Sequence, residues 1–211
     1  MTTTSTYKTG TAGLREQWIQ YVYELQERIC GALETTDEKA SFKTDDWKRD
    51  EGKGGGGRTR VLSNGNIFEK AGVNTSVVFG EVTDTMRKGL NIEGHKWFAC
   101  GLSLVLHPVN PFVPTVHANW RYFELYSEEG LVTDRWFGGG TDLTPYYLFE
   151  EDAIHFHQTL KDTLTPFGED LYAQYKQQCD DYFVNQHRNK ETRGIGGIFY
   201  DHLRAADEAA L

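Results

Sequence analysis

The stretch Thr115-Val-His-Ala-Asn-Trp-Arg-Tyr-Phe-Glu-Leu-Tyr126 decides how the whole chain is interpreted, because polar and apolar side chains alternate through its centre. Successive side chains of a β-strand point to opposite faces of the sheet. His117, Asn119 and Arg121 therefore share one face with Phe123. The opposite face carries Val116, Ala118, Trp120 and Tyr122. The stretch predicts a strand whose one face bears an imidazole, an amide and a guanidinium.

Several segments around this stretch also have the composition of strands. They are residues 59–62, 67–72, 76–82, 97–107 and 131–137. β-branched and aromatic residues are frequent in them, and turn-forming residues separate them by short distances, which favours an antiparallel sheet. Ser103 and His107 share a face of 97–107, and the proline loop 108–114 can fold that strand back onto 115–126. This hairpin would either line a polar patch or hold its histidines in ordinary hydrogen bonds.

Helices are expected before and after the strands. Apolar side chains recur every three or four residues from Leu14 to Leu33, which predicts an amphipathic helix that ends near Glu34. Residues 150–164 and 168–189 are also expected to be helical, and 198–200 could form one more strand. The four glycines at 54–57 cost backbone entropy, so we expect a mobile connection there. The pattern predicts one α+β domain over residues 1–211.

The composition excludes several classes of function. A net charge of −9 and a pI near 5.3 disfavour a nucleic-acid or anionic-membrane surface. Cys30, Cys100 and Cys179 are far apart and lack zinc spacing, which is typical of reduced, buried thiols in a cytoplasmic protein. No apolar stretch approaches the roughly 18 residues of a membrane span. The motifs of nucleotide-binding loops, nucleophile elbows and zinc proteases are also missing.

Two charged residues are candidates for chemistry. Arg121 has the fork geometry that binds a carboxylate through two parallel hydrogen bonds; its alternative role is a cross-strand ion pair with Glu124 or another acid. Asp142 ends the segment Trp136-Phe-Gly-Gly-Gly-Thr-Asp142, which we interpret as a glycine turn that lets the backbone approach a ligand. Its alternative role is an Asx-turn or a helix cap. Together these residues predict a pocket for an anionic, partly aromatic ligand.

Histidines offer a metal site by residue type alone, since neutral imidazoles bind divalent transition metals. His155 and His157 lie two apart on a predicted helix, so at most one of them can face a shared site. For a single histidine on such a helix, a structural hydrogen bond is the alternative.

Long segments of the chain closely resemble oxygen-dependent coproporphyrinogen III oxidases. The two most specific run from Ser103 to Glu124 and from Trp136 to Pro145. The similarity extends to residues 47–57, 69–74, 150–157, 166–168, 175–188 and 193–197. It therefore covers nearly everything after the first predicted helix.

The resemblance implies a large, flat, mostly antiparallel sheet with helices on both faces, in a homodimer. It also implies an oxidoreductase of haem and porphyrin biosynthesis that converts two propionates of coproporphyrinogen III to vinyls, giving protoporphyrinogen IX. Dioxygen would be the oxidant, with no organic cofactor, and carbon dioxide and hydrogen peroxide would be released.

The resemblance also implies roles for individual residues. His117 would donate a proton, and Asp142 would engage the pyrrole nitrogens. From the chemistry of the guanidinium we add the hypothesis that Arg121 positions the reacting propionate. Substrate contacts would come from Ser103, Asn119, Trp120 and Arg121. Some members are assigned a divalent metal such as manganese, through histidines that match His107, His117, His157 and His187.

Family members continue beyond the position that matches Leu211, and the missing C-terminal region would add substrate contacts and dimer interface. We therefore expect either an active oxidase or a truncated, non-catalytic tetrapyrrole-binding remnant.

Overall fold

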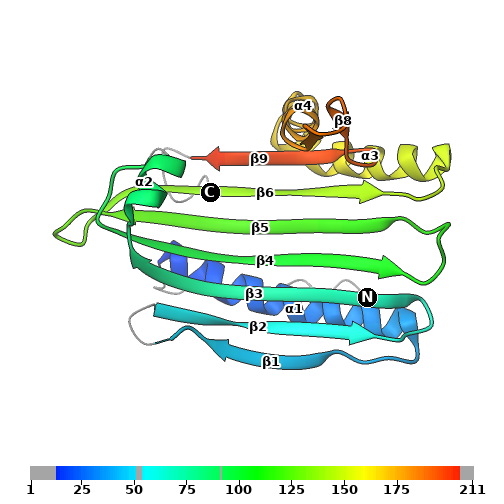
Figure 1. Cartoon of the computed structure of the whole chain (residues 1–211), viewed down its shortest axis with the longest axis horizontal. Coiled ribbons are helices and arrows are strands. Elements are labelled where there is room, and N and C mark those ends of the chain that lie inside the picture. Colours follow the sequence, from blue (N-terminus) through cyan, green and yellow to red (C-terminus); the bar gives the residue numbers. More distant parts are fainter. Residues whose placement is uncertain (1–12, 51–53, 91, 205–211) are drawn as a thin grey trace.

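A large antiparallel β-sheet dominates the computed structural model, which describes residues 13–50, 54–90 and 92–204 (Figure 1). The strands of this sheet are Lys43–Lys48 (β1), Gly54–Ser63 (β2), Phe68–Glu81 (β3), Lys96–Pro108 (β4), Thr115–Tyr126 (β5), Val132–Thr144 (β6) and Gly197–Leu203 (β9). Within the described residues, seven strands are ordered β1-β2-β3-β4-β5-β6-β9, and every neighbouring pair is antiparallel. The predicted α+β fold with an antiparallel sheet is confirmed.

The helices cover the two faces of this sheet unequally. Helix α1 (Leu14–Asp37) lies behind the sheet in Figure 1, packed on β3 and β4. Helix α2 (Asp84–Leu90) packs on the other face at one corner, where Met86 joins Trp97 and Trp136. The remaining elements are α3 (Glu150–Leu164), a 3₁₀ turn (Thr165–Phe167), α4 (Leu171–Tyr182) and a small hairpin of β7 (Val184–Asn185) and β8 (Glu191–Thr192). We call the side of α1 the covered face and the other side the open face.

Helix α4 lies along the edge strand β9. Its Tyr182 stacks on Phe199 with ring centroids 4.3 Å apart, and its Tyr175 packs on Tyr200 at 5.1 Å. Because Phe199 and Tyr200 are successive strand residues, α4 contacts both faces of β9. It therefore leaves the middle of the open face uncovered.

The main core lies between α1 and the covered face. Its buried members are Val22, Cys30, Val73, Phe98, Cys100, Leu102, Leu104, Ala118, Tyr122 and Phe137. On β4 and β5 these are the even-numbered positions, as the alternation predicts for one face of a sheet. Each large apolar side chain buried here contributes roughly 1.5–3 kcal/mol.

Polar contacts attach α1 to the sheet at two places along the helix. The buried Gln26 amide donates to the carbonyl oxygens of Arg58 and Val73 at 2.9 and 2.8 Å. At the end of the helix, the Asp37 carboxylate accepts the backbone N–H groups of Ala40, Asn66, Ile67 and Phe68. The helix therefore extends three residues beyond the predicted end, because its last acid ties it to the β2–β3 turn.

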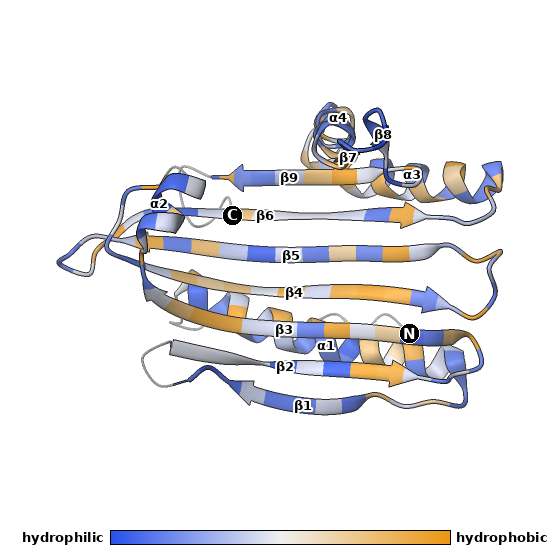
Figure 2. Cartoon of the chain, viewed as in Figure 1, coloured by the Kyte–Doolittle hydropathy of each residue, from blue (hydrophilic) through white to orange (hydrophobic). Residues whose placement is uncertain are grey.

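The prediction of a mobile glycine connection at 54–57 was wrong. These glycines begin β2; all four pair with β3, and Gly56 and Gly57 also pair with β1. A Cβ on Gly57 would lie 2.2 Å from the Thr75 carbonyl oxygen and 2.6 Å from the Trp47 ring. Gly55 has a φ of +98°, which favours glycine. The glycines thus permit close approach of neighbouring strands, and they form the pale start of β2 in Figure 2.

Other element boundaries also differ from the prediction. Strand β3 is continuous where two strands were expected, because its pairing with both β2 and β4 runs unbroken from Lys70 to Phe79. Strand β6 continues through the glycines 138–140 to Thr144, so no glycine turn precedes Asp142. The second C-terminal helix ends at Tyr182, and the β7–β8 hairpin replaces its predicted last turns. Strand β1 and helix α2 were not predicted.

Candidate active site

The open face brings His117 and Asp142 together as cross-strand neighbours on β5 and β6. The imidazole Nδ1 lies 2.8 Å from the Asp142 carboxylate oxygen Oδ1. The Asp142 side chain is 4% exposed, whereas that of His117 is 33% exposed. A buried carboxylate bonded to Nδ1 fixes the orientation of the ring. Nε2 remains as the ring nitrogen that can exchange a proton with a ligand.

Arg193 completes this group, and the sequence analysis did not single it out as a site residue. Its Nη2 forms an ion pair with Oδ2 of Asp142, and its guanidinium stacks 4.4 Å from the Phe183 ring centroid. Gly194, at a φ of +56°, follows it, and a Cβ there would lie 2.3 Å from the Leu143 carbonyl oxygen. This glycine lets the chain cross β6 closely and places Arg193 over Asp142. The signal in the sequence was the Arg-Gly pair before Ile195-Gly-Gly.

Arg121 lies on the same face, as the alternation of β5 predicts. Its Nη1 donates to Oδ1 of Asn119 at 3.2 Å, and its Nη2 lies 3.1 Å from Oδ2 of Asp201. The guanidinium carbon is 5.5 Å from the Phe199 ring centroid, and the side chain remains 41% exposed. Five N–H donors are available on a guanidinium, so these two contacts leave donors for a ligand carboxylate.

Glu124, the alternative ion-pair partner for Arg121, lies on the covered face. It accepts the Tyr122 hydroxyl at 2.7 Å and also a hydrogen bond from Tyr126. Burial, followed by the hydrogen bond to Glu124, raises the pKa of Tyr126 to about 12. The acid beside Arg121 is therefore Asp201 on β9.

The predicted substrate contacts divide between the faces. Ser103 and Asn119 are register partners on β4 and β5, and both line a shallow groove of about 300 Å³ with Arg121. Trp120 has its side chain in the covered-face core, so it meets this groove only through its backbone. Figure 2 shows the hydrophilic centre of β5 beside the pale middle of β6.

The four histidines of the expected metal site are not gathered into one cluster. His157 uses both ring nitrogens, with Nε2 3.0 Å from the Ile195 carbonyl oxygen and Nδ1 3.0 Å from the Tyr172 hydroxyl. His187 lies in the β7–β8 connection, and His107 is exposed near the end of β4. In the described part of the chain, no group of three or more His, Cys, Asp or Glu residues is arranged to hold a metal ion. The arrangement of these four histidines therefore does not fit the expected metal site.

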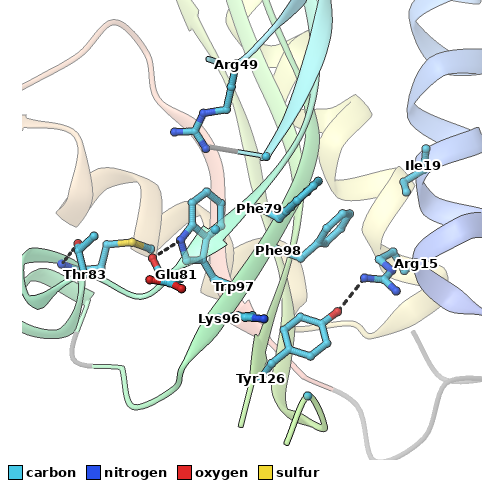
Figure 3. Close-up of a pocket in the computed structure, with 14 residues that line it drawn as sticks. Arg15, Ile19, Arg49, Phe79, Glu81, Thr83, Lys96, Trp97, Phe98 and Tyr126 are labelled. Carbon is cyan, nitrogen blue, oxygen red and sulfur yellow. Dashed lines mark hydrogen bonds between the residues drawn. The ribbon is translucent and has the colours of Figure 1, made fainter. Parts of the chain in front are cut away.

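A larger cavity of about 850 Å³ lies at the far end of the sheet, where β4 begins and β5 ends (Figure 3). Phe79, Trp97 and Phe98 supply apolar walls, and Arg49 stacks on Trp97 at 5.8 Å. Arg15, its other arginine, donates to the Tyr126 hydroxyl at 2.9 Å. Strand spacing places this cavity about 30 Å from His117. We therefore place the chemistry on the open face, which carries both the smaller groove with Arg121 and the His117–Asp142–Arg193 group.

The cysteines are buried free thiols, as expected. Cys179 lies on α4 near Asp142. Burial, with smaller contributions from the charges of Asp142 and Asp180, raises the pKa of the Cys179 thiol to about 11. A thiol in this protonation state is a poor nucleophile. In the helices that the structure describes, none combines the length and apolar composition needed to cross a bilayer.

The open face can therefore bind a carboxylate at Arg121 and move a proton at His117. Residues 17–211 match the family described as coproporphyrinogen III oxidase. The chain belongs to the coproporphyrinogen III oxidase family. Membership of this family suggests an oxidoreductase of porphyrin biosynthesis, with coproporphyrinogen III as the substrate. Four propionates and four pyrrole N–H groups on such a substrate suit a site that combines a guanidinium with acid/base groups.

Proposed function

We propose that the chain catalyses the oxygen-dependent oxidative decarboxylation of two propionates of coproporphyrinogen III to vinyls, giving protoporphyrinogen IX. For each propionate, one dioxygen accepts a hydride equivalent from the carbon chain, the carboxylate leaves as carbon dioxide, and a proton completes hydrogen peroxide. The observation that carries this proposal is the placement of Arg121 on one open face with the His117–Asp142–Arg193 group.

Arg121 binds the propionate whose carboxyl group is lost as carbon dioxide. A charge-assisted pair between guanidinium and carboxylate fixes both position and orientation, which matters because the reacting carbon must meet dioxygen. Asn119 and Phe199 hold the guanidinium by a hydrogen bond and a ring contact. Ser103, exposed and opposite Asn119, adds a hydroxyl to the same groove.

His117 supplies the proton that the peroxide needs. Asp142 was expected to engage the pyrrole nitrogens directly, but it is buried and its two oxygens already bind His117 and Arg193. We therefore assign it a different role, in which it orients the imidazole and stabilises the protonated ring. Arg193 holds the carboxylate in place through its ion pair.

The test is anaerobic addition of coproporphyrinogen III to the purified chain, followed by air. Oxygen uptake is recorded, and the products are separated and identified by porphyrin fluorescence. Divinyl product above the rate without protein, with one dioxygen consumed per propionate lost, supports the oxidase. Binding of coproporphyrinogen without oxygen uptake contradicts it and supports a non-catalytic tetrapyrrole-binding module instead.

A further inference from the structure

Asp201 is a partly exposed carboxylate on the open face, beside Arg121. The proposed chemistry gives this carboxylate no role. It lies on β9, and its side chain is 34% exposed. Oδ2 is 3.1 Å from Nη2 of Arg121 and 3.8 Å from Nδ1 of His202, and Oδ1 accepts the backbone N–H of His202 at 2.9 Å. A carboxylate has about four lone-pair positions, so these three contacts still leave acceptor capacity.

Gly138 lies beneath the pair formed by Arg121 and Asp201. A Cβ on this residue would be 2.6 Å from Nε of Arg121 and 2.6 Å from Oδ1 of Asp201. The two charged groups thus converge over a position that carries no side chain. Asp142 offers no comparable acceptor, because its side chain is 4% exposed and both of its oxygens are occupied.

A guanidinium only donates hydrogen bonds and an ionised carboxylate only accepts them. Side by side, Arg121 and Asp201 match a ligand that carries a carboxylate and N–H donors within reach of each other. Both groups are found on a tetrapyrrole with propionate side chains. The orientation of the N–H groups then depends on the oxidation state of the ring.

We propose that Asp201 is a specificity-determining residue, which accepts a hydrogen bond from a pyrrole N–H and so selects the reduced tetrapyrrole over the oxidised porphyrin. In a porphyrinogen, saturated carbon bridges let each pyrrole ring tilt and present its N–H outward. In a porphyrin, the ring is conjugated and planar, and its N–H groups point into the centre. The inference rests on the proposed function for its ligand, but not on the oxidation step.

The test is an anaerobic competition between the two oxidation states. Coproporphyrin III is fluorescent and serves as the probe, and coproporphyrinogen III, which is not fluorescent, displaces it. The measured quantity is the ratio of the two dissociation constants. Asp201→Asn should lower the preference for the porphyrinogen by about tenfold or more, the range of a hydrogen bond to a charged group. Asp201→Glu, which keeps a carboxylate, should retain part of the preference.

Asp134→Asn is the matched control. Asp134 is also 34% exposed and also paired with an arginine, Arg204, at 2.7 Å. Its substitution removes the same charge but should leave the ratio unchanged. Retained binding of coproporphyrin shows that each variant is folded.

Three results would overturn the proposal. An unchanged ratio in Asp201→Asn means that Asp201 does not sense the N–H groups. Equal weakening of both ligands means that it only positions Arg121. If neither ligand binds the wild-type chain, the proposed substrate fails and this inference fails with it. By contrast, the wild-type chain could lack oxidase activity while Asp201→Asn still loses the preference for the porphyrinogen. That result supports the role of Asp201 and refutes only the proposed reaction.

Discussion

The two faces of one sheet differ in what holds them together. On the covered face, α1 packs over buried side chains such as Tyr122 and Leu102. On the open face, charged groups meet over glycines and remain partly exposed, as Arg121 and Asp201 do over Gly138. Because β5 contributes to both faces at alternate positions, neighbouring residues have separate tasks. Substitutions one position apart should therefore change either stability or activity.

The largest effect is expected at the buried carboxylate of the open face. Asp142→Asn keeps the shape but removes the charge that orients and stabilises a protonated His117. Turnover should fall by roughly 10²–10⁴-fold, the range of general acid/base catalysis, while KM changes much less. Steady-state kinetics with coproporphyrinogen III measure both values. Near-normal turnover would remove Asp142 from the catalytic group.

On the covered face, the corresponding test is Tyr122→Ala. Tyr122 is fully buried, and its ring is 4.8 Å from that of Phe137. Removing it should lower the free energy of unfolding by about 3–5 kcal/mol, as for other buried aromatics. Tyr122→Phe is the control and should cost only about 1–2 kcal/mol, for the hydrogen bond to Glu124. Denaturant unfolding measures these values; loss of activity in fully folded Tyr122→Phe would show that the faces are not separable.

Two glycines on the open face offer a finer comparison. A methyl group at Gly138 displaces Arg121 or Asp201, so Gly138→Ala should raise KM about tenfold through misplacement of the carboxylate site. A Cβ at Gly72 would meet its nearest atom at 3.6 Å, an ordinary contact. Gly72→Ala should therefore leave KM unchanged. Equal effects of the two substitutions would argue against a ligand site over Gly138.

The smallest effect that we expect is a pH dependence of stability, which arises at the end of α1 on the covered side. Burial raises the pKa of Asp37, but four backbone N–H donors outweigh it and hold this pKa well below its usual range. The carboxylate thus stabilises the fold at pH values above about 4, the unfolded pKa, and this stabilisation is lost as the pH falls further. Asp37→Asn should lower Tm at neutral pH. The difference in Tm between this variant and the wild-type chain should become smaller below about pH 4. Asp45→Asn, on the exposed strand β1, is the control, and a constant difference for Asp37→Asn would contradict the assignment.

The sequence was sufficient for the open face of β5 because strand alternation is a local property. His117, Asn119 and Arg121 share that face as predicted, and Trp120 points away from it by the same rule. The glycine runs were misinterpreted, because their conformation depends on which strand approaches them and not on their own preference. Gly57 is extended beneath Trp47, and the run before Asp142 is extended between β5 and β9.

Two site residues, Arg193 and Asp201, could not be assigned by local patterns. They reach the site only because β9 pairs with β6 and the β7–β8 hairpin folds over Asp142. Arg193 pairs with Asp142, which lies 51 positions earlier in the chain, and Asp201 pairs with Arg121, which lies 80 positions earlier. No periodicity within one segment contains that information.

The most direct test is a substitution scan along β5 that measures activity and stability for every variant. His117→Ala, Asn119→Ala and Arg121→Ala should lose activity with coproporphyrinogen III while Tm changes little. Val116→Ala, Trp120→Ala and Tyr122→Ala should lower Tm while the activity of the folded fraction is retained. If losses of activity and stability did not alternate along the strand, the open face would not be the active site.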